Sequence, residues 1–374
     1  MPARTDQAGA SVAGAGRGRA ERDVAALGHV PAGRASGGCC ANWRRPRPRP
    51  VRRRGPGRTE NSPDNRRRAL PDWMVCAGDV RWMPEMDHQV VIAQNREALE
   101  VTLKFAQRAL LEPRWIPGAA SQAEAELANS EAGQNGPWGE DPPRTAYAGA
   151  NLMMAAVLDD LGSLRQLLGE PMPVIGPTVV ARSAIEIAST VWWLMEPGIG
   201  VRRRVCRELV LSLKSARRAK QVAQDMDSSQ AVTDALQQES RVLQRITDLD
   251  IGQPGPGYSP VIEGERALSA TAGTAQMLKA VLPANSSATV IYRVYSAVTH
   301  GEVYGLMSFM APGVSSNGET KLHWHLDPDV LDSTIQMAIV AFREAYRRIH
   351  QVMGWGKLES DLWEIKLGKI FNGA

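Results

Sequence analysis

Two side chains of one expected helix are of types that could carry out phosphoryl chemistry. The helix contains the segment 292–302, which reads YRVYSAVTHGE, so that Arg293 and His300 are seven residues apart. Seven steps of about 100° return to within roughly 20° of the start, which places both side chains on one helix face, two turns apart. Arginine holds a phosphate with its forked N–H donors, and histidine can take a proton from a ribose 2′-hydroxyl or return one to the leaving oxygen. Arg293 and His300 are therefore candidate catalytic residues for RNA cleavage, with no metal and no other cofactor required.

The spacing of these two residues also sets a geometric limit. Two turns separate them by roughly 10 Å along the helix axis. Helical side chains lean toward the N-terminus, so Arg293 points away from His300. If two copies pack these helices antiparallel about a two-fold axis, Arg293 of one copy can approach His300 of the other. We therefore expect a homodimer with RNA bound in a cleft between the copies.

This pattern resembles the signature of the HEPN superfamily, an arginine followed after four to six residues by a histidine on a late helix of a small bundle. Arg293 and His300 match it at its longest spacing, and the resemblance covers about residues 145–354. The resemblance implies a metal-independent endoribonuclease of a toxin–antitoxin or phage-defence system, with a small antitoxin protein as a partner. The superfamily also contains catalytically silent modules that bind RNA or proteins.

The segment is also similar to that of actinobacterial HEPN-like helical proteins, in which an earlier helix carries an arginine and a glutamate. The matching pair here is Arg182 and Glu186, although their i, i+4 spacing on a helix also predicts a plain surface or half-buried ion pair. The residues that this similarity adds as possible support on the later helix are Tyr292, Ser296 and Glu302. One departure is Val294, because the residue after the arginine is often polar in active members. An alternative is that Arg293 forms a structural ion pair with Glu186 or Glu302 while His300 is a core or helix-terminal residue. A non-catalytic RNA-binding or protein-interaction module of unknown role therefore remains the second hypothesis.

The elements that must position these residues are predicted to be all-α. From residue 83 to 374 the apolar spacing is helical almost everywhere, which predicts a bundle of about seven to nine helices. The segment 114–143 is rich in Gly, Pro and acidic residues and is expected to be a long exposed loop. A possible sub-boundary lies at 252–262, around the breaker QPGPG. The expected helices are 92–110, 145–168, 177–196, 201–226, 229–249, 267–282, 285–310 and one that begins at Pro328.

Two of these helices present distinctive faces. The last one has an apolar stripe that needs a partner helix, in this chain or in a second copy, and the stripe consists of Leu331, Ile335, Ala338, Phe342, Ala345, Ile349 and Val352. The helix 201–226 is expected to have a very basic outer face made of Arg202, Arg203, Arg204, Arg207, Arg217, Arg218 and Lys220. The last three of these are candidate contacts for the RNA backbone.

The first 82 residues form an Arg/Pro/Gly-rich tail that we expect to be disordered. Up to Asp72 the chain has 16 Arg, no Lys and 6 acidic residues, a net charge of +10; because the whole chain is +4, the remainder carries 4 − 10 = −6. An Arg-rich tail can bind nucleic acid. The alternative, which we favour, is that this stretch is not translated and that Met74, Met83 or Met86 is the start.

Composition argues for a cytoplasmic protein without a membrane segment or a metal. The most apolar stretch, 178–195, is interrupted by Arg182 and Glu186, and no apolar stretch near Met1 resembles a signal sequence. Cys206 is the one cysteine of the expected folded part, which allows no disulfide framework there. His323 and His325 have no third ligand at a convincing spacing, so no metal site is expected.

Overall fold

The computed structural model describes residues 88–111, 115–128, 132–133, 136–139, 141–282, 288–314 and 320–372. All of these residues belong to one unit, which spans Leu70–Ala374. The expected basic tail, its disorder and the alternative start codons lie outside the described residues. The expected sub-boundary at 252–262 stays a prediction.

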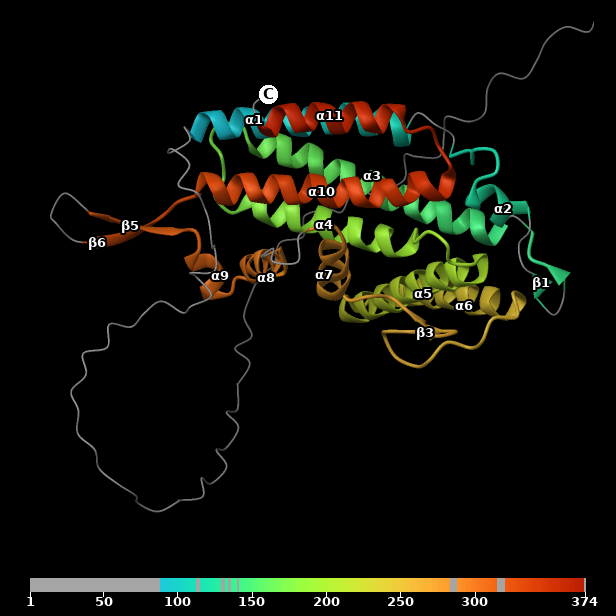
Figure 1. Cartoon of the computed structure of the whole chain (residues 1–374). Helices are drawn as coiled ribbons and strands as arrows, with labels where there is room; N and C mark the ends of the chain where they lie inside the picture. The colour runs from blue at the N-terminus through green and yellow to red at the C-terminus, as the bar shows by residue number, and fades with distance from the viewer. Residues whose placement is uncertain are drawn as a thin grey trace, which may run out of the picture. The chain divides into compact units, whose positions relative to one another are not determined.

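The described part of the chain is mostly helical, which confirms the expected fold class. It contains eleven α-helices, one π-helical turn and three short two-stranded hairpins, so the expected number of seven to nine helices is too low (Figure 1). The helices are α1 (His88–Ala106), α2 (Gln122–Ala128), α3 (Asp141–Leu167), α4 (Gly176–Leu194), α5 (Val201–Asp225), α6 (Ser229–Asp248), α7 (Ala270–Val281), α8 (Ala288–Thr299), α9 (Val303–Met307), α10 (Pro328–Met353) and α11 (Leu358–Asn372). The π-helical turn is Gln107–Leu111, and the antiparallel strand pairs are β1–β2 (Ala132–Gly133, Gly136–Pro137), β3–β4 (Val261–Ile262, Glu265–Arg266) and β5–β6 (Met310–Val314, Thr320–Trp324).

Capping residues explain where the longest helices begin and end. Asp327 caps α10, because its carboxylate accepts a hydrogen bond of 2.8 Å from the backbone N–H of Asp329. Gly354 ends the same helix in the left-handed region with a φ of 67°, a conformation that a residue without Cβ adopts at little cost. Pro177 lies in the first turn of α4, where its missing N–H is no loss.

The apolar stripe of α10 is buried inside this chain. All seven of its residues are fully buried, and α10 packs against α4 and α1. Figure 1 shows α10 running alongside α4, with α1 and α11 paired next to it. The seam therefore has its partner helices within one copy and needs no second copy to cover it.

The segment 114–143 is not simply the long exposed loop that composition predicts. Within it, α2 packs against α10 and α3, and the side chains of Ala123 and Glu126 are buried. The segment is anchored because the backbone N–H of Gly118 donates to the carbonyl of Met353 at 2.7 Å, and Ser121 Oγ accepts from the N–H of Glu124 at 3.0 Å. An acidic, alanine-rich sequence thus supplies a buried carboxylate to the core.

The expected helix 285–310 is divided into two helices and a strand. The helix α8 is followed by Gly301, whose φ of 68° is left-handed, and α9 begins two residues later. Gly305 lets α9 approach α8 closely, because a Cβ at this position would lie 2.7 Å from the backbone nitrogen of Val298. The hairpin β5–β6 follows, so His323 and Trp324 lie on an extended strand.

None of the helices in the described residue ranges is both long and apolar enough to span a bilayer.

Candidate active site on α4 and α8

The contact between α4 and α8 brings together residues that are more than a hundred positions apart in the chain. On α4, Arg182 and Glu186 are one turn apart and form an ion pair, with 2.6 Å between Arg182 Nε and Glu186 Oε1. The side chain of Arg182 is 13% exposed and that of Glu186 is 26% exposed, so water reaches this pair. The pair is the half-buried one that the i, i+4 spacing predicts.

Tyr292 of α8 connects this ion pair to the second helix. Its hydroxyl donates a hydrogen bond of 2.7 Å to Glu186 Oε1, and the side chain is buried. Burial of the ring raises the pKa of Tyr292, and the hydrogen bond to the Glu186 carboxylate raises it further, while Arg182 opposes both effects. Tyr292 is therefore a neutral donor that fixes one carboxylate oxygen of Glu186.

His300, near the C-terminal end of α8, completes the cluster. Arg182 Nη2 lies 3.4 Å from His300 Nε2, and Arg182 Nη1 lies 3.5 Å from the carbonyl oxygen of Ser296. Because a guanidinium can only donate, Nε2 would be the acceptor of a hydrogen bond in this contact. His300 itself is exposed. Of the two alternative positions for His300, the core position is therefore wrong, and the helix-terminal position is correct, since α8 ends at Thr299.

Of the seven residues predicted for catalysis or its support, the structure gathers five and leaves Arg293 and Glu302 outside. Arg182, Glu186, Tyr292 and His300 join through their side chains, and Ser296 joins through its backbone carbonyl. The cluster has an imidazole at the surface, a guanidinium beside it, and a carboxylate and a phenol that hold the guanidinium in place. A guanidinium can bind a phosphate, and an imidazole can take up or release a proton.

Arg293 lies apart from this cluster. Its side chain is exposed and forms no ion pair or hydrogen bond within the described part of the chain; only its backbone carbonyl accepts a bond, at 3.5 Å, from the hydroxyl of Tyr304. Glu302 is exposed at the N-cap position of α9 and makes no side-chain cap. The suggested ion pair of Arg293 with Glu186 or Glu302 is therefore not formed, and Glu186 pairs with Arg182 instead.

The basic outer face expected for α5 is wrong in part, because two of its arginines point inward. Arg204 is fully buried and Arg207 is 3% exposed. Near the middle of α5, Arg217 Nε and Lys220 Nζ lie 2.9 Å and 3.6 Å from the two carboxylate oxygens of Glu239. Arg218 is exposed and donates to Gln221 at 2.8 Å. Of the three candidate contacts for RNA, two are thus already paired with a carboxylate.

A second cluster of the same residue types is buried between α5, α2 and α3. Arg204 Nε and Nη2 lie 2.9 Å and 3.1 Å from the two oxygens of Glu126, and Nη1 donates to the carbonyl of Leu194 at 2.8 Å. The hydroxyl of Tyr147 also donates to Glu126. This cluster was not predicted, since it depends on Glu126, a residue of the segment expected to be a loop.

The other candidate positions point to no further site. In the described residues, no three or more His, Cys, Asp or Glu side chains are grouped so that they could hold a metal ion. Cys206 is buried, and burial raises the pKa of its thiol to about 12, so the thiol is not a reactive nucleophile at neutral pH.

No protein-family model matches the chain, and searches of curated proteins and of solved structures find no match. A function therefore has to be inferred from the chemistry of the α4–α8 cluster.

Proposed function

We propose that the cluster of Arg182, Glu186, Tyr292 and His300 is the active site of a cytoplasmic, metal-independent endoribonuclease that resembles the HEPN superfamily. The observation that carries the proposal is the 3.4 Å approach of the Arg182 guanidinium to the exposed imidazole of His300. A fixed cation beside a histidine at the surface can bind a phosphodiester and transfer its protons. The resemblance adds the setting, a toxin–antitoxin or phage-defence system with a small antitoxin protein as a partner.

The proposed reaction is an internal transesterification of RNA. A phosphate oxygen accepts a hydrogen bond from Arg182 Nη2, which contacts His300 in the protein without substrate. His300 Nε2 is then free to accept the proton of the ribose 2′-hydroxyl. The 2′-oxygen attacks the adjacent phosphorus, and the bond from phosphorus to the 5′-oxygen breaks. A water molecule protonates that leaving oxygen, and protonated His300 returns its proton to the resulting hydroxide. The products are a 2′,3′-cyclic phosphate and a 5′-hydroxyl, so no water and no metal are consumed.

In this scheme Arg182 contacts the phosphate, and Glu186 and Tyr292 position Arg182. Arg182 stays charged throughout and stabilises the extra negative charge that develops on the phosphate oxygens. Glu186 accepts from Arg182 Nε and so fixes the plane of the guanidinium. Tyr292 holds Glu186 in turn. The guanidinium is thereby oriented before substrate binds, which lowers the cost of organising the site.

A homodimer is part of the proposal because Arg293 lies apart from the cluster of its own copy and could contact the phosphate only from a partner subunit. In an in-line displacement the attacking and leaving oxygens lie on opposite sides of phosphorus. Arg293 is exposed on α8, which ends directly before His300, and its side chain has no partner in the described part of its own chain. In a dimer with antiparallel α8 helices, Arg293 of the partner subunit would contact the phosphate bound at His300. Arg217, Arg218 and Lys220 remain candidate contacts for the RNA backbone, and exposed Arg218 is the most available of them.

Cleavage of end-labelled single-stranded RNA by the full chain in EDTA tests the proposal. The wild type should cleave, and His300→Ala should reduce the rate by about a hundredfold or more, as for loss of a general acid or base. The matched control is His325→Ala, which removes another exposed imidazole and should leave the rate unchanged. New 3′ ends should be cyclic phosphates. A His300→Ala protein that cleaves as fast as the wild type would rule out this site.

Mixing two inactive variants tests the dimer. If Arg293 acts across the interface, His300→Ala mixed with Arg293→Ala should regain activity, because some mixed dimers contain one complete site. Mixing His300→Ala with Arg182→Ala should not, since both residues belong to the same copy of the site. Regained activity in the second mixture and not in the first would contradict this arrangement.

The alternative function is a non-catalytic module that binds another protein or RNA. It is favoured by large apolar side chains exposed on α9 and β6, which follow α8 in the chain: Val303 is 74% exposed, Tyr304 is 53% exposed and Trp324 is 50% exposed. A wild-type chain that binds RNA or a protein partner but cleaves no RNA would support this alternative.

A further inference from the structure

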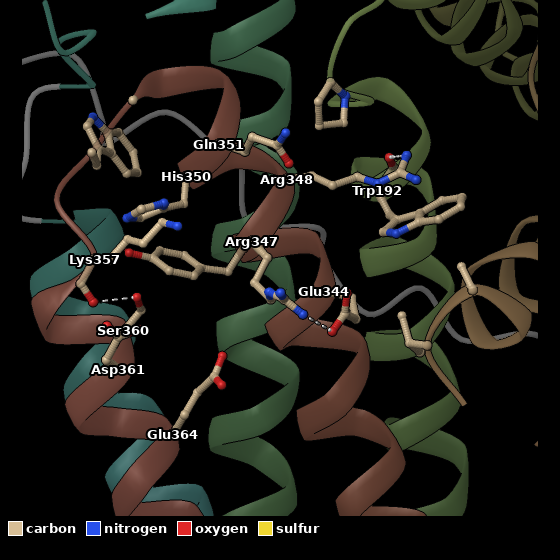
Figure 2. Close-up of a pocket in the computed structure, with 16 residues that line it drawn as sticks. Trp192, Glu344, Arg347, Arg348, His350, Gln351, Lys357, Ser360, Asp361 and Glu364 are labelled. Carbon is tan, nitrogen blue, oxygen red and sulfur yellow. Dashed lines mark hydrogen bonds and ion pairs between the residues drawn. The ribbon is translucent and has the colours of Figure 1, made fainter. Parts of the chain in front are cut away.

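A second candidate site lies at the other end of α4. A cavity of about 780 Å³ opens where the C-terminal ends of α4, α7 and α10 meet the first turns of α11 (Figure 2). Its volume is in the range of small-molecule sites. None of the four side chains of the proposed active site lines it. The cavity therefore has to be explained separately from the cleavage chemistry.

The most unusual group in its wall is the guanidinium of Arg348. Its Cζ lies 3.3 Å from the centroid of the Trp192 ring, and its Nη1 donates to the carbonyl of Trp192 at 2.6 Å. This stacking holds the guanidinium flat against α4. Figure 2 shows the two side chains meeting across the gap between α10 and α4.

Arg348 is half-buried and has no carboxylate within ion-pair distance in the described residue ranges. Burial lowers the pKa of Arg348 to about 10, and nearby Arg207 acts in the same direction, while Glu196 and Glu344 oppose them. A desolvated cation without a close counter-ion is costly to the folded protein, and a bound anion would offset that cost.

Two of the three acidic side chains of the wall, Glu344 and Glu364, are paired with other arginines, and the third, Asp361, is exposed to solvent. Glu344 Oε1 lies 3.4 Å from Arg347 and 3.7 Å from Arg343, and Glu364 is held by Arg343 at 3.0 Å. Figure 2 shows the pair of Arg347 and Glu344 to one side of Arg348. These carboxylates are therefore neutralised without Arg348, and exposed Lys357 adds another positive charge to the rim.

We propose that this cavity binds a small ligand through an oxyanion group, a phosphate or a carboxylate, held by Arg348. A guanidinium has five N–H donors, and the Trp192 carbonyl uses one of them, which leaves donors for a fork around two ligand oxygens. The stacked ring pre-organises that fork, so little side-chain entropy is lost on binding. Gln351, one turn further along α10, also lines the cavity and offers an amide to the ligand.

Titration of the full chain with three probes tests the site: inorganic phosphate, adenosine 5′-monophosphate and benzoate, followed by calorimetry and by tryptophan fluorescence. At least one probe should bind with saturation and a ratio of one per chain. Arg348→Gln and Arg348→Lys should each weaken that binding about tenfold or more, because the charged, forked hydrogen bonds are lost. The probe that binds most tightly identifies the oxyanion and shows whether a free phosphate or a nucleotide is preferred.

Two control variants separate this site from other cationic sites. Arg241→Gln removes an exposed arginine of α6 and should not change the affinity. Arg182→Gln should not change it either, which distinguishes the cavity from the proposed active site whatever the outcome for RNA cleavage. If Arg348→Gln fails to fold, Arg348→Lys, which keeps the charge, carries the test. Absence of binding by all three probes at millimolar concentration, or equal binding by the wild type and Arg348→Lys, would overturn the proposal.

Discussion

The molecule contains two clusters with the same three residue types in very different surroundings. Arg204, Glu126 and Tyr147 form a cluster that is closed to solvent, with Arg204 fully buried and Glu126 7% exposed. Arg182, Glu186 and Tyr292 form the other, in which the arginine is 13% and the glutamate 26% exposed. In both, a tyrosine hydroxyl donates to the carboxylate that holds the arginine.

The two clusters differ in how many N–H donors of the arginine are free to bind a ligand. In the closed cluster, Arg204 donates hydrogen bonds to both carboxylate oxygens of Glu126 and to the carbonyls of Leu194 and Glu196. In the open cluster, Arg182 makes one short bond to Glu186, and its two remaining contacts, to Ser296 and His300, are as long as 3.5 Å and 3.4 Å. A saturated, buried arginine stabilises a fold, whereas a loosely held arginine beside an exposed histidine can exchange a contact for a ligand.

The largest expected effect is loss of stability when the closed cluster is broken. Arg204→Met should lower the free energy of unfolding by about 3–5 kcal/mol, because Glu126 would be left buried without its counter-charge. The matched change in the open cluster, Arg182→Met, should cost about 1 kcal/mol or less, since water reaches that pair. Urea unfolding of both variants measures the difference. Equal losses would show that the two clusters do not differ in the way that their burial implies.

The next effect is on catalysis and should be confined to the open cluster. Arg182→Lys keeps the charge but loses the fork, and RNA cleavage should fall by about a hundredfold, as for loss of a transition-state donor. Arg203→Lys, at an exposed arginine of α5 that pairs with Glu265, is the control and should keep the rate. Single-turnover rates on the same RNA provide the comparison, and an unimpaired Arg182→Lys enzyme would remove Arg182 from the site.

The two tyrosines allow the clusters to be compared at alkaline pH. The pKa of Tyr147 is raised strongly, first by burial and then by the Glu126 carboxylate, with Arg204 opposing. An unfolded tyrosine ionises near pH 10, so the stabilising contribution of Tyr147 is complete below that pH and is lost as the pH rises above it. Above pH 10 the free energy of unfolding should therefore fall less steeply with pH in Tyr147→Phe than in the wild type, by about 1.4 kcal/mol per pH unit.

Tyr292→Phe should change the dependence of unfolding free energy on pH less than Tyr147→Phe does, because the Glu186 carboxylate beside Tyr292 is better solvated. Urea unfolding at several values between neutral pH and about pH 11 measures both slopes. A larger change in Tyr292→Phe than in Tyr147→Phe would reverse the assignment of the closed and open clusters.

The smallest expected effect is that of Tyr292→Phe at neutral pH. Loss of its single hydrogen bond to Glu186 should cost about 0.5–1.5 kcal/mol of stability. RNA cleavage should fall less than tenfold, since Tyr292 only positions Glu186. Unfolding and cleavage assays on this one variant measure both, and a loss of activity as large as that of His300→Ala would make Tyr292 a participant in the chemistry.

Local patterns predicted most helices and the pair on α4. Pro177, Asp327 and Pro328 mark helix starts correctly, because capping and the geometry of proline act over a few residues. The i, i+4 spacing of Arg182 and Glu186 gave their contact for the same reason. The helices α2 and α11 were not expected, and α9 was expected only as the end of one longer helix. The exposed Leu358, Leu362 and Ile365 show that the apolar pattern of α11 is weak.

The unpredicted features depend on packing between distant segments. The contact of Arg182 with His300 exists because α4 packs against α8. The sequence alone had favoured Arg293, which was expected on one helix with His300, but α8 ends at Thr299, directly before His300. The two errors over Glu126 and Arg204 have one cause. Glu126 was expected in an exposed loop and Arg204 on an outer helix face, but the two side chains bury each other. Their local sequences carry no signal of this contact.

The most direct measurement is a double-mutant cycle on RNA cleavage in EDTA with Arg182→Ala, His300→Ala and the combined variant of the full chain. If the two residues form one site, each single change should lower the rate by about a hundredfold or more, and the combined variant should be little slower than the slower single variant. Independent losses that multiply, or cleavage by the wild type that neither change affects, would contradict a shared site on α4 and α8.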